Sequence, residues 1–264
     1  SVSIPNQPAT KMKVVLVCLV LVAQSFAEQR IADSREVHPP GKWPWMGSLQ
    51  FYDDPPGPVQ GTWVHHCGCA VIEDSNSYRY ILTAAVCVDG MDVNYLRVVL
   101  GAHDIITGKE GLPEIYAVWN YYVHEDFVNG FPSGFPNDIA VVMTGNPIST
   151  DNPFIDVLPM TESAENDTEG HMGQECMFAG WGSQSGSSGT VNLLREAPMN
   201  IISNQECSDR WGGQPPVTNM HICHFEDQGP MAVPCSGDNG GPIFCRETEN
   251  DEWEMVGIGS WGSP

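Results

Sequence analysis

Short runs of β-branched and apolar residues, each bounded by turn-forming residues, constrain the fold of this chain most strongly. The runs cover 70–72, 80–82, 96–100, 139–143 and 255–259. Clusters of Gly, Pro, Asn and Asp separate them at fairly regular intervals, and helical periodicity is scarce. One short helix is expected around 203–210, where Ser203 can cap the N-terminus and Glu206 follows in the first turn. The pattern predicts an all-β fold, either a sandwich or a barrel.

The start of the chain has the pattern of a processed leader. From Met12 onward, a basic start is followed by an apolar run and by small residues ending near Ala27. This is typical of a secretory signal peptide over 12–27, and residues 1–11 are interpreted as upstream residues outside any domain. A short propeptide, 28–30, is expected next. The mature part keeps about 235 residues, enough for one large all-β domain or two barrels.

The cysteine content indicates an oxidising compartment. The chain has nine cysteines, and Cys18 leaves with the signal peptide, so eight remain. His65, His66, Cys67 and Cys69 form a tempting metal-ligand cluster. Along a strand these side chains point to alternating faces, which gives poor tetrahedral geometry. We therefore expect disulfide and packing roles there, with no metal and no cofactor, in a secreted, extracellular protein.

The chain is strongly acidic, with 33 Asp and Glu against 11 Lys and Arg and a net charge of −22. Binding to phosphate groups requires a basic face, so neither nucleic acid nor an anionic membrane is an expected partner. Solubility of a secreted protein is the simplest interpretation of this charge, and attraction of cationic partners is the alternative.

Several motifs occur in a fixed order along the chain. They are Arg30-Ile31-Ala32-Asp33, the stretches 43–49, 67–72, 83–87, 137–140 and 180–182, Cys235-Ser236-Gly237-Asp238-Asn239-Gly240-Gly241-Pro242, and the stretch 259–262. Together they resemble the chymotrypsin/trypsin family of serine proteases over about 31–264. The resemblance implies two six-stranded antiparallel Greek-key β-barrels, over about 31–145 and about 146–264. Because the chain stops at Pro264, we expect the second barrel to be incomplete, as in a truncated record.

The resemblance also locates the residues of the catalytic reaction. The family uses a serine nucleophile, a histidine base and an aspartate that orients the histidine. In this chain those positions hold Asn239, Val86 and Asp138. An amide cannot act as the nucleophile and an isopropyl group cannot accept a proton. The oxyanion hole, implied at the backbone N–H groups of Gly237 and Asn239, does not depend on side chains.

Further positions follow from the resemblance alone. Cleavage after Arg30 would free the Ile31 amine to pair with the Asp238 carboxylate, and His65 or His66 is expected in a structural role near that carboxylate. The substrate pocket is implied at Val233, Ser236, Ser260, Trp261 and Gly262. Val233 at its base favours an apolar side chain of modest size. Ala102 stands where the family has its first calcium-binding carboxylate, so no calcium is expected.

The resemblance pairs six cysteines, as Cys67–Cys87, Cys176–Cys245 and Cys207–Cys223. Cys69 is expected to be a buried free thiol. Cys235 normally pairs with a cysteine beyond the end of this chain. Asn166 opens an N-glycosylation sequon, Asn166-Asp167-Thr168, in an acidic segment.

These observations predict a secreted, monomeric, non-catalytic homologue of serine proteases. It would bind a protein or peptide without cutting it, or act as a cofactor for an active relative. Two alternatives stay open. One is a serine-type endopeptidase with residual or unorthodox activity, supported by Asp138 and the oxyanion turn. The other is an acidic storage or structural protein, supported by composition alone.

Overall fold

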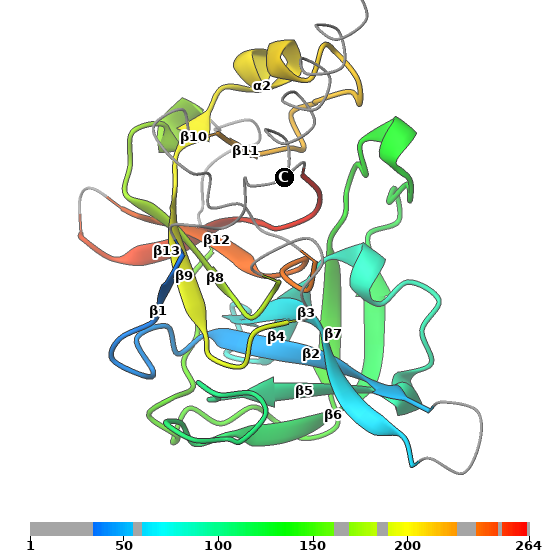
Figure 1. Cartoon of the computed structure of the whole chain (residues 1–264), viewed down its shortest axis with the longest axis vertical. Coiled ribbons are helices and arrows are strands. Elements are labelled where there is room, and N and C mark those ends of the chain that lie inside the picture. The colour runs from blue at the N-terminus through cyan, green and yellow to red at the C-terminus, as the bar shows by residue number, and fades with distance from the viewer. Residues whose placement is uncertain are drawn as a thin grey trace, which may run out of the picture.

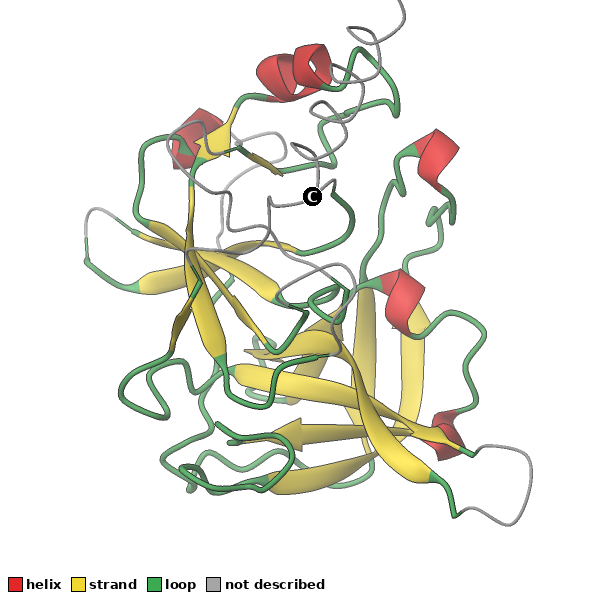
Figure 2. Ribbon diagram, viewed as in Figure 1, coloured by secondary structure: helices red, strands yellow, loops and turns green. Residues whose placement is uncertain are grey.

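A computed structural model describes residues 34–54, 60–160, 169–183, 190–225, 236–247 and 250–262. This part of the chain consists almost entirely of strands and loops (Figures 1 and 2), with one α-helix, α2 (Asn204–Arg210). Several predicted features lie outside the described residues: the signal peptide and propeptide, Arg30, Ile31, Asn166, Val233 and Cys235. Among the described residues, no helix is long and apolar enough to cross a membrane.

Six strands form a closed antiparallel barrel in the first half of the chain, as predicted. They are β2 (Met46–Asp53), β3 (Thr62–Glu73), β4 (Arg79–Thr83), β5 (Leu96–Leu100), β6 (Glu114–Val123) and β7 (Ala140–Thr144), and they close in the order β2-β3-β4-β7-β6-β5. Alternation of side chains fills the interior. On β6, Tyr116 and Val118 are buried whereas Ile115 and Trp119 face outward. The short apolar runs in the sequence are therefore barrel strands.

The second half contains a five-stranded antiparallel sheet in the order β1-β9-β8-β12-β13. Its strands are β1 (Arg35–Glu36), β8 (Cys176–Gly180), β9 (Arg195–Met199), β12 (Pro242–Arg246) and β13 (Trp253–Ile258). A separate pair is formed by β10 (Ile201–Ile202) and β11 (Cys223–His224). The all-β prediction is confirmed, and this sheet with its pair is the described part of the second barrel. The N-terminal strand β1 lies in this second sheet, whereas the family resemblance implies that residues from about 31 belong to the first barrel.

An aromatic core joins the two halves. Trp43 packs against Phe244 and Trp253, with ring centroids 4.8 and 5.1 Å apart. Ala70 and Leu82, on the outer face of the first barrel, belong to the same buried cluster. Burial of this much apolar surface holds the sheet and the barrel together.

Three disulfides connect Cys67–Cys87, Cys176–Cys245 and Cys207–Cys223, which are the predicted pairs. In the chain-entropy account the two short loops contribute about 3 kcal/mol each, and the longer Cys176–Cys245 loop contributes about 4 kcal/mol. Cys69 is a buried free thiol, as expected, and burial raises its pKa. The helix expected at 203–210 is α2, and the Ser203 side chain accepts the backbone N–H of Glu206 at 3.1 Å.

Candidate functional site

The three triad positions lie together between the two halves of the molecule. Val86 lies in η1 (Ala85–Cys87), a 3-10 turn that follows β4. Its backbone N–H donates to Asp138 Oδ1 at 2.8 Å. The Ser260 hydroxyl donates to Asp138 Oδ2 at 2.5 Å, and the side-chain amide of Asn239 donates to the Ser260 carbonyl. Hydrogen bonds thus link all three positions, with Ser260 in the middle.

Asp138 is a buried carboxyl, and no basic side chain of the described residues lies beside it. Its hydrogen-bond partners are the Ser260 hydroxyl and the backbone N–H groups of Ala85 and Val86. Burial raises the pKa of Asp138 above its usual range, and the hydrogen bonds from Ser260 and the backbone oppose that shift only in part. The side chain that would use this carboxyl in proton transfer, an imidazole at position 86, is replaced by an isopropyl group.

The turn at 237–240 has the backbone geometry of an anion-binding turn. Gly237 and Gly240 have φ angles of 95° and 79°, in the left-handed region. A Cβ atom on Gly240 would lie 2.1 Å from the Thr83 hydroxyl, so only glycine fits there. The backbone N–H groups of Gly237 and Asn239 donate to no residue of the described chain. Two free donors in one tight turn can receive a carbonyl oxygen.

A row of side chains on the outer face of the first barrel, where it meets the second sheet, supports this turn. The Ser48 hydroxyl lies 2.7 Å from His65 Nδ1, and His65 Nε2 donates to the Gly237 carbonyl at 2.9 Å. Because the carbonyl only accepts, Nε2 carries the proton and Nδ1 accepts from Ser48. Gln50 donates to Ser48 at 3.4 Å and accepts from Arg97 at 2.8 Å. Burial lowers the pKa of His65 to about 4, although the Gly237 carbonyl opposes the shift.

Asp238 is buried against a pair of glycines at the end of β8. The Gly182 N–H donates to Asp238 Oδ1 at 2.8 Å, and a Cβ on Gly182 would lie 2.2 Å from that carboxylate. His65 was expected to have a structural role near Asp238. Its two ring nitrogens instead contact Ser48 and the Gly237 carbonyl, so it supports the turn and not the carboxylate. The expected partner of Asp238, Ile31, lies outside the described residues.

The described pocket residues have different surroundings. Ser236 is exposed and its carbonyl accepts the Ser183 N–H at 2.9 Å. Ser260 is half-buried because its hydroxyl faces Asp138, whereas Gly262 is exposed. Trp261 is half-buried, and its indole N–H donates to the Gly134 carbonyl at 2.8 Å.

Trp261 is part of an aromatic cluster that the sequence did not predict, formed with Phe131, Trp211 and His221. Its ring centroid lies 5.7 Å from Phe131, 5.0 Å from Trp211 and 5.9 Å from His221. His221 also contacts the Gly134 carbonyl, at 2.7 Å from Nε2. These residues come from three segments far apart in sequence, so no local pattern groups them. Trp261 directly follows Ser260 in the chain, so the cluster lies beside the residue that contacts Asp138.

Residues 33–264 match the family model described as Trypsin. The chain belongs to the trypsin family. It is 33% identical over 229 residues to a "Chymotrypsin-like serine proteinase" from Haliotis rufescens, covering 84% of this chain and 78% of that relative. It is 28% identical over 225 residues to a "Fibrinolytic enzyme, isozyme C" from Lumbricus rubellus, covering 84% of each.

The residues at the triad positions can be compared with those that the trypsin family uses. The motif resemblance assigns the catalytic aspartate position to Asp138 and the oxyanion hole to the N–H groups of Gly237 and Asn239. Val86 and Asn239 depart from the residue types that this chemistry uses. The three disulfides fit an extracellular protein, the usual compartment for stable disulfides.

Proposed function

We propose that this trypsin-family chain binds a protein or peptide in its cleft without cleaving it, either alone or as a cofactor for an active relative. The observation that carries the proposal is the chemistry of the triad positions. No group at position 239 can attack a carbonyl carbon, and no group at position 86 can take up a proton. Asp138 is hydrogen-bonded to Ser260 and backbone N–H groups instead.

The backbone turn at 237–240 and the aromatic side chains near it support the binding role. The free N–H groups of Gly237 and Asn239 can donate hydrogen bonds to a peptide carbonyl oxygen. Trp261 and its aromatic neighbours offer apolar contact beside them. The His65 contact holds the Gly237 carbonyl and so keeps the turn in place. A bound segment would gain hydrogen bonds and apolar burial with no covalent step.

A peptide library incubated with the immobilised chain tests this proposal. We expect certain peptides to be retained and then recovered intact by mass spectrometry. Trp261→Ala should weaken retention at least tenfold, while Trp119→Ala removes an exposed indole from the outer face of β6 and should leave retention unchanged. Cleaved peptides, or no retention above a blank matrix, would overturn the proposal.

A serine-type endopeptidase is the second candidate, favoured by the names of the two relatives and by one contact. The hydroxyl of Ser260 donates directly to the buried Asp138 carboxyl, so a serine and a potential base do meet in the cleft. Hydrolysis that survives repurification and disappears in both Ser260→Ala and Asp138→Asn would support this candidate. Absence of labelling by a fluorophosphonate probe in unsubstituted protein would count against it.

Secretion, cleavage after Arg30 and glycosylation of Asn166 complete the proposal. All three concern residues outside the described part of the chain. The disulfides support secretion, because stable disulfides are typical of extracellular proteins. N-terminal sequencing of protein secreted from cultured cells should give Ile31 as the first residue after processing. Treatment with an N-glycosidase should lower its mass, and Asn166→Gln should abolish that change.

A further inference from the structure

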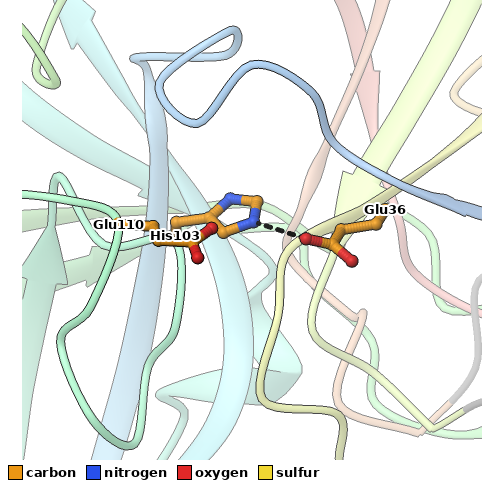
Figure 3. Close-up of side chains that lie close together, drawn as sticks. All are labelled: Glu36, His103 and Glu110. Atoms are coloured by element: carbon orange, nitrogen blue, oxygen red, sulfur yellow. Dashed lines mark hydrogen bonds and ion pairs between the residues drawn. The ribbon is translucent and has the colours of Figure 1, made fainter.

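A buried histidine lies between two acidic side chains on the side of the molecule where β1 meets the loop after β5. The three residues are Glu36 on β1, His103 and Glu110 (Figure 3). One ligand atom from each lies within 4.8 Å of the others. Glu36 and Glu110 have no Lys or Arg partner within the described ranges of the chain. Two acidic charges thus face one imidazole without a cation to balance them.

The fold positions His103 rigidly. Its ring is 1% exposed, and its carbonyl accepts both the Trp181 indole N–H and the Leu194 N–H at 3.0 Å. The loop then returns through a hydrogen bond from Leu112 N–H to the Gly101 carbonyl at 2.9 Å. This return places Glu110 beside His103, whereas Glu36 arrives from the second sheet.

The contacts of His103 are poor for a hydrogen-bonded histidine. Nε2 lies 3.3 Å from Glu36 Oε1. This distance is longer than that of most N–H···O hydrogen bonds, which measure about 2.7–3.2 Å. The other ring nitrogen, Nδ1, is buried and has no hydrogen-bond partner among the described residues. Nδ1 points away from Nε2 on the ring, so an ion held between Nε2 and the glutamates would leave Nδ1 to a water molecule.

The same spacing suits two ligands of one metal ion. Ligands about 2.0–2.1 Å from a tetrahedral zinc ion lie roughly 3.3–3.4 Å apart. A fourth donor is close, because His38 Nε2 lies 3.5 Å from the same Glu36 oxygen and its side chain is exposed and free to turn. Calcium and magnesium prefer oxygen ligands alone, so the imidazole selects against them.

We propose that Glu36, His103 and Glu110 bind a divalent ion of the zinc class, with His38 or water as the fourth ligand. The ion would join β1 to the loop at 101–112 and so fix the N-terminal strand on the first barrel. This proposal is independent of catalysis, since the cluster involves none of Val86, Asp138 and Asn239. It also differs from the four-residue cluster at 65–69, where Cys67 is held in a disulfide.

Metal-stripped protein titrated with zinc chloride tests the site by calorimetry and thermal unfolding. We expect one ion to bind, and at about a hundredfold excess over Kd the melting temperature should rise by roughly 5–10 °C. Glu36→Gln and Glu110→Gln should each weaken binding at least tenfold. Glu125→Gln, a change of an exposed acid elsewhere, is the matched control and should bind as the unsubstituted chain does.

Three results would overturn the site. They are no rise in melting temperature with zinc, a rise that persists in the Glu36→Gln/Glu110→Gln double variant, and a rise with calcium alone. His103→Asn removes the nitrogen ligand directly and should abolish binding. Because that residue is fully buried, the two glutamate variants keep the proposal testable if His103→Asn does not fold.

Discussion

Burial and hydrogen bonding shift the pKa of Asp138 in opposite directions. Burial raises its pKa, so the folded carboxyl keeps its proton to higher pH than the unfolded one. Between the ordinary pKa and this raised value the folded state binds more protons. The free energy of unfolding therefore falls as pH rises through that window. The catalytic triad of the family places a histidine next to this aspartate, whereas position 86 of this chain is a valine.

We predict that Asp138→Asn does not destabilise the chain at neutral pH, changing the free energy of unfolding by less than about 1 kcal/mol. The amide oxygen can still accept the Val86 N–H, and the Ser260 hydroxyl can rotate to accept from the amide nitrogen. Urea unfolding between pH 4 and 7 checks this. Asp138→Ala is the comparison, since it leaves buried donors unpaired at a cost of about 1–3 kcal/mol. A loss in Asp138→Asn as large as in Asp138→Ala would contradict the prediction.

His65 should make the chain sensitive to mild acid. Its pKa is lowered to about 4 in the fold, against 6.5 for a free side chain. Between those values the unfolded state binds more protons, so stability falls as pH drops from 6.5 towards 4. A shift of this size corresponds to about 3 kcal/mol. Unfolding curves of His65→Gln should lose this part of the pH dependence, because glutamine can still donate to the Gly237 carbonyl but does not titrate.

His124→Gln is the matched control for that measurement, because it removes an imidazole from an exposed position. Equal pH dependence in the His65→Gln variant and the unsubstituted chain would show that His65 is not the group responsible. The protonation state of His65 also bears on function, since a protonated Nδ1 could no longer accept a hydrogen bond from the Ser48 hydroxyl. Acid should therefore loosen the turn at 237–240.

At the scale of elements, Glu196 fastens the N-terminal segment to β9. Its buried carboxylate accepts hydrogen bonds from Arg35 at 2.8 Å, from Lys42 at 2.9 and 2.8 Å and from the Trp43 indole at 2.6 Å. Burial alone would raise the pKa of Glu196, but the hydrogen bonds from Lys42, Arg35 and Trp43 outweigh it and lower the pKa. This one side chain holds β1 beside β9 and orients Trp43 in the aromatic core.

We predict that Glu196→Gln destabilises the chain by about 3–5 kcal/mol, because Lys42 is then left without its buried counter-charge. Chemical unfolding measures this change. Glu175→Gln is the matched control, since it removes the partner of Arg246 in an exposed ion pair and should cost under about 1 kcal/mol. Equal effects of the two substitutions would mean that Glu196 does not hold the segment.

Local patterns predicted individual elements well. The strands β4, β5, β7 and β13 match the β-branched runs to within two residues, whereas β3 contains the run 70–72 but begins at Thr62. The helix α2 begins at the predicted cap, because periodicity and capping act over a few residues. Contacts between distant segments had no such signal. The pairing of β1 with β9, the aromatic cluster around Trp261 and the grouping of Glu36 with His103 depend on the folded chain. The family resemblance supplied the triad positions and the disulfides, which no periodicity encodes.

At the scale of the whole molecule, the packing that holds the two halves together lies apart from positions 86 and 239, on which the proposed binding role rests. The aromatic core sets the relation of barrel to sheet and does not involve position 86 or 239. Under the proposed binding role, side chains at these two positions can change without loss of the core packing. If only the two side chains are missing, replacing both should restore chemistry without rebuilding the protein.

We predict that the double variant Val86→His/Asn239→Ser hydrolyses a peptide ester at least about a thousandfold faster than the unsubstituted chain, given that removal of a complete triad costs roughly a millionfold. The backbone N–H at position 86 already contacts Asp138 Oδ1, so a histidine there begins beside its orienting carboxylate. Either single variant should gain less than about tenfold, because triad members act as a unit. Stopped-time assays on protein with a verified N-terminus, together with fluorophosphonate labelling of Ser at position 239, measure the gain.

Adding Asp138→Asn to the double variant provides the control, since it should remove most of the restored rate while leaving the fold intact. An unsubstituted chain that already matches the double variant would contradict the proposed binding role, because its activity would then come from other residues. A folded double variant that stays inert would instead show that the cleft has lost more than its two reactive side chains. In that case the free N–H groups of Gly237 and Asn239 would serve binding alone, and Trp261→Ala should still weaken peptide retention.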